Sequence, residues 1–292
     1  MTRYSPDLSG FGAVSLGELN GRAALLDRME NKYLIRSDRF DAVINDLRDV
    51  FDLLVIDGRA VFTYETIYFD TADFQSYYQH LQGKRRRYKI RTRRYVDSDL
   101  CFLEVKLKGV RGRTVKRRQT CPLDQHGRVS REGTRFVRET FASVYGERFE
   151  VPYFPRLAML YRRLTLVGGQ PERVTVDYDF QFAGPGDARA TAPSDVVIVE
   201  VKSERGRGYA DRVMREHQVR DGNCSKYCVG LNLIRPNLRC NRFRRTLESH
   251  FDWSPDDEVE PDPSVLPRSM LPAGSCFDPM ATPPTGVVLG LR

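Results

Sequence analysis

Charged residues alternate with apolar residues along one strand-like run after another, and this pattern constrains the fold more than any other feature of the sequence. Alternation with a period of two is typical of a β-strand whose two faces meet different surroundings. In the basic run 85–95 and its partner 100–108, the charged positions are Arg87, Lys89, Arg91, Arg93, Glu104, Lys106 and Lys108. In the other runs they are Glu30, Lys32, Lys116, Arg118, Arg173, Asp177, Asp179, Glu200 and Lys202. The opposite positions are rich in Val and Leu, which predicts that each strand buries one face.

About eight such runs in hairpin order, with a few helical segments between them, predict an α+β fold. We expect an antiparallel β-barrel, closed or nearly closed, with flanking helices. One helix is expected from Ser37 to Phe51, because apolar residues recur there at helical spacing. The predicted organisation is a flexible leader over 1–21, a folded domain over 22–250 and a Pro-rich, disordered tail over 251–292.

The charged faces have two interpretations. A solvated outer face explains any one strand, since antiparallel sheets often present one face to water. Arg and Lys dominate at neighbouring positions, however, and like charges on adjacent strands repel unless an anion or a carboxylate neutralises them. If the sheet closes with this face inside, it forms a basic tunnel with a few carboxylates. Such a tunnel suits a ligand with many phosphates and a divalent metal ion.

The net charge supports an anionic partner without choosing one. The chain has 292 residues, a formal charge of +8 and a pI near 9.2, which favour nucleic acid, phosphate compounds or a membrane surface. Nucleic-acid patches usually lie on an exposed helix or loop, whereas GKRRRYKIRTRR alternates as a strand does, so no nucleic-acid partner is expected. The chain has no apolar signal core and no run of transmembrane length, which predicts a soluble, cytoplasmic protein without a membrane segment.

A series of short segments carries a family resemblance. In chain order they are RMENKYLI, YFDT, YKIRTRRY, FLEVKLK, TVKRR, YRRL, RVTVDYDF, VEVK and SKY. This ordered series resembles the polyphosphate polymerase domain of the VTC (vacuolar transporter chaperone) family, one of the triphosphate tunnel metalloenzymes, which include the CYTH-type triphosphatases. The resemblance implies a polymerase that transfers the terminal phosphate of ATP to a growing polyphosphate chain, with Mn²⁺ or Mg²⁺ as cofactor.

The resemblance also implies roles for individual residues. For catalysis it points to Arg91, Arg93, Arg163 and Glu200, and it gives Glu200 the metal ion. For phosphate binding it points to Lys32, Lys106, Lys116, Arg173, Lys202, Ser225 and Lys226, and strand parity adds Arg87, Lys89 and Arg118. Arg gives bidentate contacts to phosphate oxygens and Lys gives a point charge, so a ring of both suits a polyphosphate.

One position departs from the CYTH-type pattern Glu-x-Glu-x-Lys. The corresponding residues here are Arg28, Glu30 and Lys32, so a phosphate contact replaces one metal ligand, which favours the polymerase branch. Two roles stay open for Glu30, as a second metal ligand or as a salt-bridge partner of a tunnel arginine. Metal ligation and charge balance also stay open for Asp177 and Asp179.

Two other functions stay open. A tunnel-type triphosphatase would hydrolyse inorganic or nucleoside triphosphate, with Glu30 as the best candidate to activate water. A non-catalytic module would bind polyanions without turnover. Eukaryotic versions of the domain sit beside regulatory and membrane-spanning parts, so coupling to translocation here would need a separate membrane partner.

Overall fold

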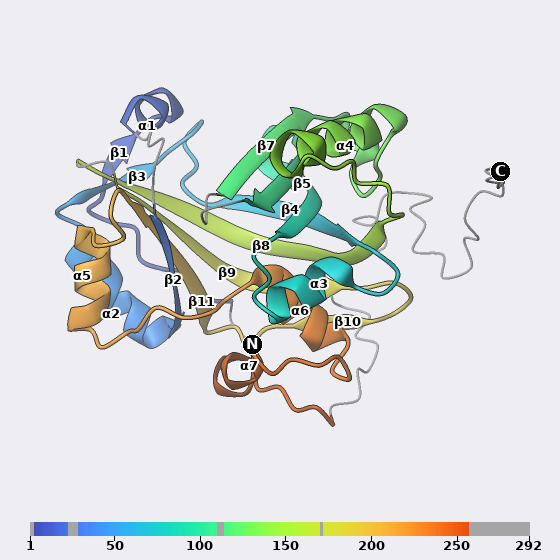
Figure 1. Ribbon diagram of the computed structural model, residues 1–292. Helices are drawn as coiled ribbons and strands as arrows, with labels where there is room; N and C mark the ends of the chain where they lie inside the picture. The colour runs from blue at the N-terminus through green and yellow to red at the C-terminus, as the bar shows by residue number, and fades with distance from the viewer. Residues whose placement is uncertain (1–2, 23–28, 110–113, 170–171, 257–292) are drawn as a thin grey trace, which may run out of the picture.

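A curved antiparallel sheet organises the molecule (Figure 1). The computed structural model describes residues 3–22, 29–109, 114–169 and 172–256. The strands follow one another across the sheet in the order β2, β11, β9, β8, β4, β5, β6, β7. Their bounds are β2 Met29–Arg36, β4 Phe62–Asp70, β5 Arg87–Tyr95, β6 Leu100–Lys108, β7 Thr114–Thr120, β8 Phe154–Gly168, β9 Arg173–Ala183 and β11 Val196–Ser203.

Each pairing along this path is antiparallel, which confirms the predicted α+β class. In the described part of the chain no ladder joins β2 to β7, so the hydrogen-bonded sheet is open at these two edges. The short strand β10 (Arg189–Thr191) pairs with β9, and the 3₁₀ turns η1 (Val96–Ser98) and η3 (Leu123–Gln125) follow β5 and β7.

The N-terminal residues differ from the predicted leader. The strand β1 (Gly12–Val14) pairs in parallel with β3 (Phe51–Leu54), and α1 (Leu16–Arg22) follows β1. Val14 and Leu19 are buried in a small apolar cluster beside β3 and β8. The sequence pattern did not reveal these elements because a three-residue strand is too short to display a period.

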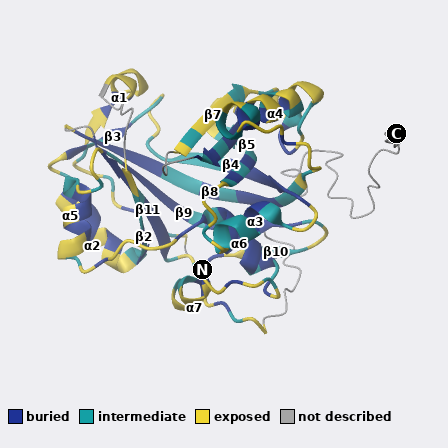
Figure 2. Ribbon diagram, in the orientation of Figure 1, coloured by how far each residue is buried: buried dark blue, intermediate teal, exposed yellow. Residues whose placement is uncertain are grey.

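The outer face of the sheet is apolar and is covered by helices. The helices α2 (Ser37–Leu47) and α5 (Tyr209–Glu216) pack on the half formed by β2, β11 and β9, and α4 (Arg131–Tyr145) packs on β5 and β6. Figure 2 shows exposed residues on these helices and buried residues in the strands beneath them. The helix α2 ends at Leu47, not at Phe51 as predicted, because Phe51 is buried as the first residue of β3.

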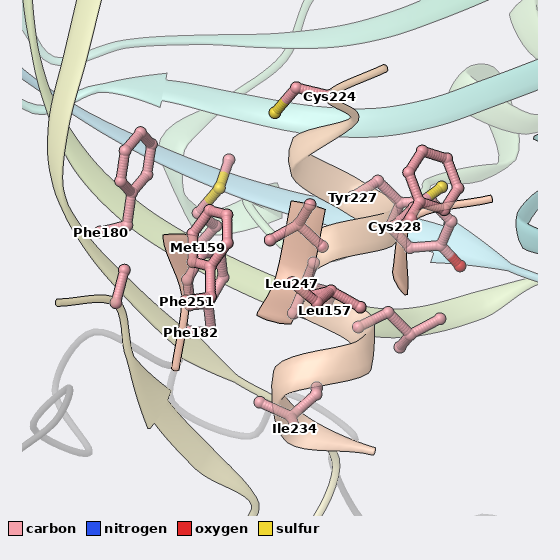
Figure 3. Packing of buried hydrophobic residues seen from close by; sticks show 14 of the residues in the cluster. Leu157, Met159, Phe180, Phe182, Cys224, Tyr227, Cys228, Ile234, Leu247 and Phe251 are labelled. Carbon is pink, nitrogen blue, oxygen red and sulfur yellow. The ribbon is translucent and has the colours of Figure 1, made fainter. Parts of the chain in front are cut away.

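The inner face of the sheet changes character along its strands. At one end it is apolar and is covered by α3 (Gln75–Leu81), α6 (Lys226–Ile234) and α7 (Arg244–His250). Figure 3 shows residues of α6 beside Leu157 and Phe182 of the sheet. At the other end the inner face carries the charged residues of the strands. The helices thus cover one half of the inner face and leave the charged half for a ligand.

Residues 251–256, which the sequence assigned to the tail, are part of the fold. Phe251 and Trp253 are 4% and 6% exposed, in the apolar cluster that includes α6 and α7. The indole Nε1 of Trp253 donates to the carbonyl oxygen of Asn232 at 3.2 Å. The rest of the predicted tail, 257–292, lies outside the described residues. Among the helices that are described, none is long and apolar enough to cross a membrane.

Candidate functional site

The charged half of the inner face collects the residues predicted from strand parity. Strand register places them opposite one another, with Lys32 facing Glu200, Arg173 facing Lys202, Arg163 facing Asp177, Arg91 facing Glu104, Lys106 facing Lys116, and Arg118 facing Glu104 from its other side. The pairs on β5, β6 and β7 and on β8 and β9 join consecutive strands, whereas the pairing of β2 with β11 brings Lys32 to Glu200 from a distant part of the sequence.

Glu200 on β11 is surrounded by lysines. Its carboxylate lies 2.8 Å from Nζ of Lys226, 3.5 Å from Nζ of Lys202 and 3.7 Å from Nζ of Lys32. Burial alone would raise the pKa of Glu200, but the lysines, led by Lys226, hold it well below its usual value. Glu200 is therefore a carboxylate anion at neutral pH, and 14% of its side chain remains open to solvent.

Asp177 on β9 forms a second ion-paired centre. Arg163 on β8 donates from Nε and Nη2 to both carboxylate oxygens, and the Nη2 bond is 2.7 Å long. Nζ of Lys226 lies 2.7 Å from Oδ2 of Asp177, so one ammonium group joins Asp177 to Glu200. Burial opposes ionisation, yet Arg163 and Lys226 lower the pKa of Asp177. These contacts favour the charge-balancing role for Asp177.

The predicted parity is wrong for Asp179. The register between β8 and β9 shifts between Leu160 and Arg162, and the backbone of Asp179 has a left-handed φ of 57°. A bulge of this kind reverses the alternation of side chains beyond it. The carboxylate of Asp179 lies 3.7 Å from Nε of Arg162 and 3.8 Å from Nε of Arg3, apart from the ion pairs of Asp177.

Glu104 on β6 organises a third centre, for which the sequence indicated no role. Its side chain is 1% exposed, and its carboxylate lies 2.6 Å from Arg91, 3.1 Å from Lys116 and 3.8 Å from Arg93. Burial would raise the pKa of Glu104, but Arg91 and Arg93 hold it well below the usual value. The signal in the sequence was that Glu104 is the single acidic residue in the two strands of a basic hairpin.

Two tyrosines of β4, Tyr64 and Tyr68, contact the three arginines that were predicted to be catalytic. Nη1 of Arg91 donates to the hydroxyl of Tyr68 at 3.0 Å. The guanidinium groups of Arg93 and Arg163 lie 5.5 Å and 5.0 Å from the ring centroid of Tyr64. Cation–π contacts of this kind favour one orientation of the planar group. The three arginines are therefore pre-oriented before any anion binds.

Ser225 and Lys89 connect the sheet to α6. The hydroxyl oxygen of Ser225 caps α6 by accepting from the backbone N–H of Cys228 at 3.2 Å. The same oxygen accepts from Nζ of Lys89 at 3.0 Å. Since Lys226 follows Ser225 directly, the start of α6 places both predicted residues beside the charged half of the inner face.

The two halves of the sheet face each other across this site. Burial lowers the pKa of Lys32 to about 8, Glu200 opposes the change, and Lys106 and Lys89 from the far half lower it further. Lys106 in turn has a pKa lowered by burial and partly restored by Glu200. Lys89 on β5 donates to Ser225 at 3.0 Å, and the adjacent Lys226 donates to Glu200 on β11 at 2.8 Å. The two halves of the sheet therefore meet at the start of α6, even though β5 and β11 are far apart in the strand order.

Glu200 and Glu30 are the carboxylates for which the sequence predicts a role in holding a divalent metal ion. Glu30 is ion-paired with Lys32, and Lys32 also reaches Glu200, so one ammonium group lies between the two carboxylates. Within the described ranges, no cluster of three or more His, Cys, Asp or Glu residues could hold a metal ion by itself. Mg²⁺ usually takes one or two carboxylates and completes its shell with water and substrate phosphates. The pair fits that pattern, and Arg28 lies outside the described residues.

Lys32 and Lys116 predict a pH dependence of anion binding. Burial brings the pKa of each to about 8, and nearby cations contribute, so both ammonium groups lose protons as the pH rises through about 8. A bound polyanion raises both pKa values. We therefore expect affinity for tripolyphosphate to fall above pH 8, and binding near pH 8 to take up protons. Titration calorimetry in two buffers of different ionisation enthalpy measures this uptake, which should decrease in Lys116→Gln; equal uptake in both proteins would contradict the assignment.

Ion-paired carboxylates, outnumbered by Arg and Lys, lie on the inner face of a curved antiparallel sheet, an arrangement that suits a polyanionic ligand. A family model of the VTC domain matches residues 27–235. The chain belongs to the VTC-domain family, as the resemblance in its sequence implied. A search of the curated proteins found no match to the chain.

Among solved structures, the chain is similar to HpAC1 from Hippeastrum, an adenylyl cyclase candidate described as having a dominant triphosphatase activity. That pair shares 13% identity over 69% of this chain and 94% of the other, with a TM-score of 0.41. An adenylate cyclase candidate from Bacillus halodurans shares 13% identity over 68% and 94%, with a TM-score of 0.40. The protein PH1819 from Pyrococcus horikoshii shares 14% identity over 72% and 99%, with a TM-score of 0.40.

Proposed function

We propose that the protein is a metal-dependent polyphosphate polymerase, which transfers the terminal phosphate of ATP to a growing polyphosphate chain. Membership of the VTC-domain family supports this function. The cytoplasm, where ATP is available, is the location that goes with it. A separate membrane partner would be needed for translocation of the product.

The observation that carries the proposal is the arrangement of cations around the three carboxylates. Arg91, Arg93 and Arg163 are held by Glu104, Asp177 and tyrosine rings. Phosphoryl transfer depends mainly on positioning and on neutralising charge at the transferred group. Pre-oriented guanidinium groups supply both, since each can grip two phosphate oxygens without reorganising.

The ion pairing of the carboxylates favours a phosphate acceptor over water. Glu30, Glu104, Asp177 and Glu200 each contact a Lys or Arg side chain. A carboxylate neutralised in this way is a weak base, and hydrolysis needs a group that positions and deprotonates water. The terminal phosphate of a polyphosphate chain is already anionic and requires no strong base.

Glu200, with Glu30, would hold the Mn²⁺ or Mg²⁺ ion. When bound, the ion would offset the negative charge that develops on the transferred phosphoryl group. Lys32, whose ammonium group contacts both carboxylates, would neutralise a phosphate group bound beside them. Lys202 and Lys226 would keep Glu200 oriented.

The test is to incubate the full chain with ATP and either Mn²⁺ or Mg²⁺. Products are resolved on a gel stained for polyphosphate, and free phosphate is assayed in parallel. Metal-dependent synthesis of long chains is the expected result. Orthophosphate without chains would reassign the protein to the tunnel-type triphosphatases, and neither product would leave a polyanion-binding module.

Lys106→Gln provides a matched variant for this assay. In the part of the chain that the structure describes, Lys106 makes no ion pair, so its replacement leaves no buried carboxylate without a partner. We expect the KM for ATP to rise about tenfold, as for the loss of one charged contact of ~1.4 kcal/mol. The melting temperature should stay the same or rise. An unchanged KM would show that Lys106 does not contact the nucleotide's phosphates.

A further inference from the structure

Two groups of cations on the inner face differ in the partners that they contact. One group contacts Glu104, Asp177 or Glu200 and consists of Arg91, Arg93, Lys116, Arg163, Lys226, Lys32 and Lys202. The second group consists of Arg87, Lys89, Lys106, Lys108 and Arg242. We call it the outer strip because it runs along the inner face of the sheet outward to solvent. As far as the chain is described, no residue of the outer strip forms an ion pair with a carboxylate.

Strand register concentrates the charge of the outer strip. Arg87 on β5 is directly opposite Lys108 on β6, and Lys89 is directly opposite Lys106. The next pair along the same two strands is Arg91 with Glu104, where the charges are opposite. Like charges directly opposite on neighbouring strands destabilise a sheet. Two consecutive pairs of this kind therefore favour an anion between or above them.

Arg242 extends the outer strip beyond the sheet. Its Nη1 lies 2.6 Å from the position that a Cβ atom would take at Gly83, in the turn before β5, where φ is +64°. Its Nη2 donates to Asn223 at 3.1 Å. Nη1 of Arg87 donates to the carbonyl oxygen of Lys84 at 2.7 Å, so Arg87 contacts the same turn that Arg242 approaches at Gly83. Since Arg242 is exposed, the strip leads from the inner face to solvent.

We propose that the outer strip binds the distal phosphates of a linear polyphosphate, beyond those that react. The inference rests on the proposed function and adds a direction to it. The carboxylates proposed to hold the metal ion, Glu200 and Glu30, contact Lys32 of the first group and mark the reacting end. The near end of the strip, Lys89 and Lys106, would contact the phosphates next to the reacting one, including those of a bound nucleotide. Phosphates farther along the chain would neutralise Arg87 and Lys108, and finally Arg242 at the exposed end.

A short anion and a long anion should therefore depend differently on the outer strip. Tripolyphosphate fits among the ion-paired cations and leaves the far end of the strip unused. A long chain engages the whole strip, so its affinity should fall more steeply with salt, by about 0.7 in log–log slope for each additional contact.

The experiment compares the full chain with the double variant Lys108→Gln/Arg242→Gln, without ATP or metal ions. Affinities for tripolyphosphate and for long-chain polyphosphate are measured by calorimetry at several salt concentrations. We expect the long chain to lose about tenfold in affinity and roughly 1.4 in salt slope, while tripolyphosphate changes less than about twofold. Equal losses for both anions, or no loss for either, would overturn the proposal.

Two controls separate the strip from net charge and folding. Arg135→Gln/Arg148→Gln removes the same charge from exposed positions in and just after α4, which covers the outer face, and should leave both affinities unchanged. Lys108→Arg/Arg242→Lys keeps the charges and should bind the long chain as the unmodified protein does. A single-stranded oligonucleotide that binds as tightly and loses as much affinity in the test variant would overturn the assignment to polyphosphate.

The outcome is independent of the polymerase assay. If long chains bind through Lys108 and Arg242 but no chains are synthesised from ATP, the role of the outer strip is supported and the proposed function is rejected. If chains are synthesised but the affinity for long-chain polyphosphate does not depend on these residues, the proposed function is supported and the role of the outer strip is rejected.

Discussion

Replacement of Glu104 by Gln is expected to destabilise the fold by about 3 kcal/mol, the typical cost of breaking a buried ion pair from one side. The amide keeps the shape of the side chain but leaves Arg91, Arg93 and Lys116 together without their carboxylate. Urea unfolding at neutral pH measures the loss. Tripolyphosphate should stabilise the variant more than the unmodified protein, because the anion takes over the neutralisation of the three cations.

The pH dependence of the same variant gives a second check. The pKa of Glu104 lies well below its usual value in the folded protein, so its stabilisation is present above the unfolded pKa, near 4.3, and is lost as the pH falls through the folded pKa. The stability difference between the two proteins should therefore shrink in acid. Glu139→Gln, at an exposed position of α4, is the control. A loss below about 1 kcal/mol at neutral pH would show that Glu104 is not a structural anchor.

Replacement of Glu200 by Gln is expected to lower turnover about a hundredfold or more, the scale found when an electrostatic stabiliser of a transition state is removed. Without metal ions, however, the variant should bind polyphosphate as tightly as before or more tightly. Its three neighbours, Lys32, Lys202 and Lys226, lose their shared carboxylate and have more charge available for phosphate.

Two measurements distinguish the metal-holding role from a structural one. Metal titration of activity should show that Glu200→Gln needs a higher Mn²⁺ concentration, whereas Lys106→Gln should need the same concentration and show a raised KM. Calorimetry without metal ions gives the affinity for polyphosphate. Turnover and metal-free affinity that fall together would mean that Glu200 shapes the phosphate site and does not hold the ion.

Strand parity predicted most of the charged face because it depends on local geometry alone. Side chains alternate along any extended strand, so Arg91 and Arg93 had to lie on one face, and Ile90 and Thr92 on the other. The rule failed at Asp179, where a bulge reverses the alternation. Strand parity also did not predict β1, whose burial depends on contacts with β3 and β8.

The sequence by itself determined the class of fold, the family and most of the residues that face inward, since each follows from composition and order within short segments. Only the tertiary structure decided which charges meet. Glu104 holds Arg91, Arg93 and Lys116 because register aligns β5, β6 and β7, and Lys226 joins Asp177 to Glu200 because α6 packs beside β9 and β11. Long-range pairing also leaves Arg87 opposite Lys108 without a carboxylate between them. An ion pair depends on the distance between two side chains in space, and the order of residues along the chain does not give that distance.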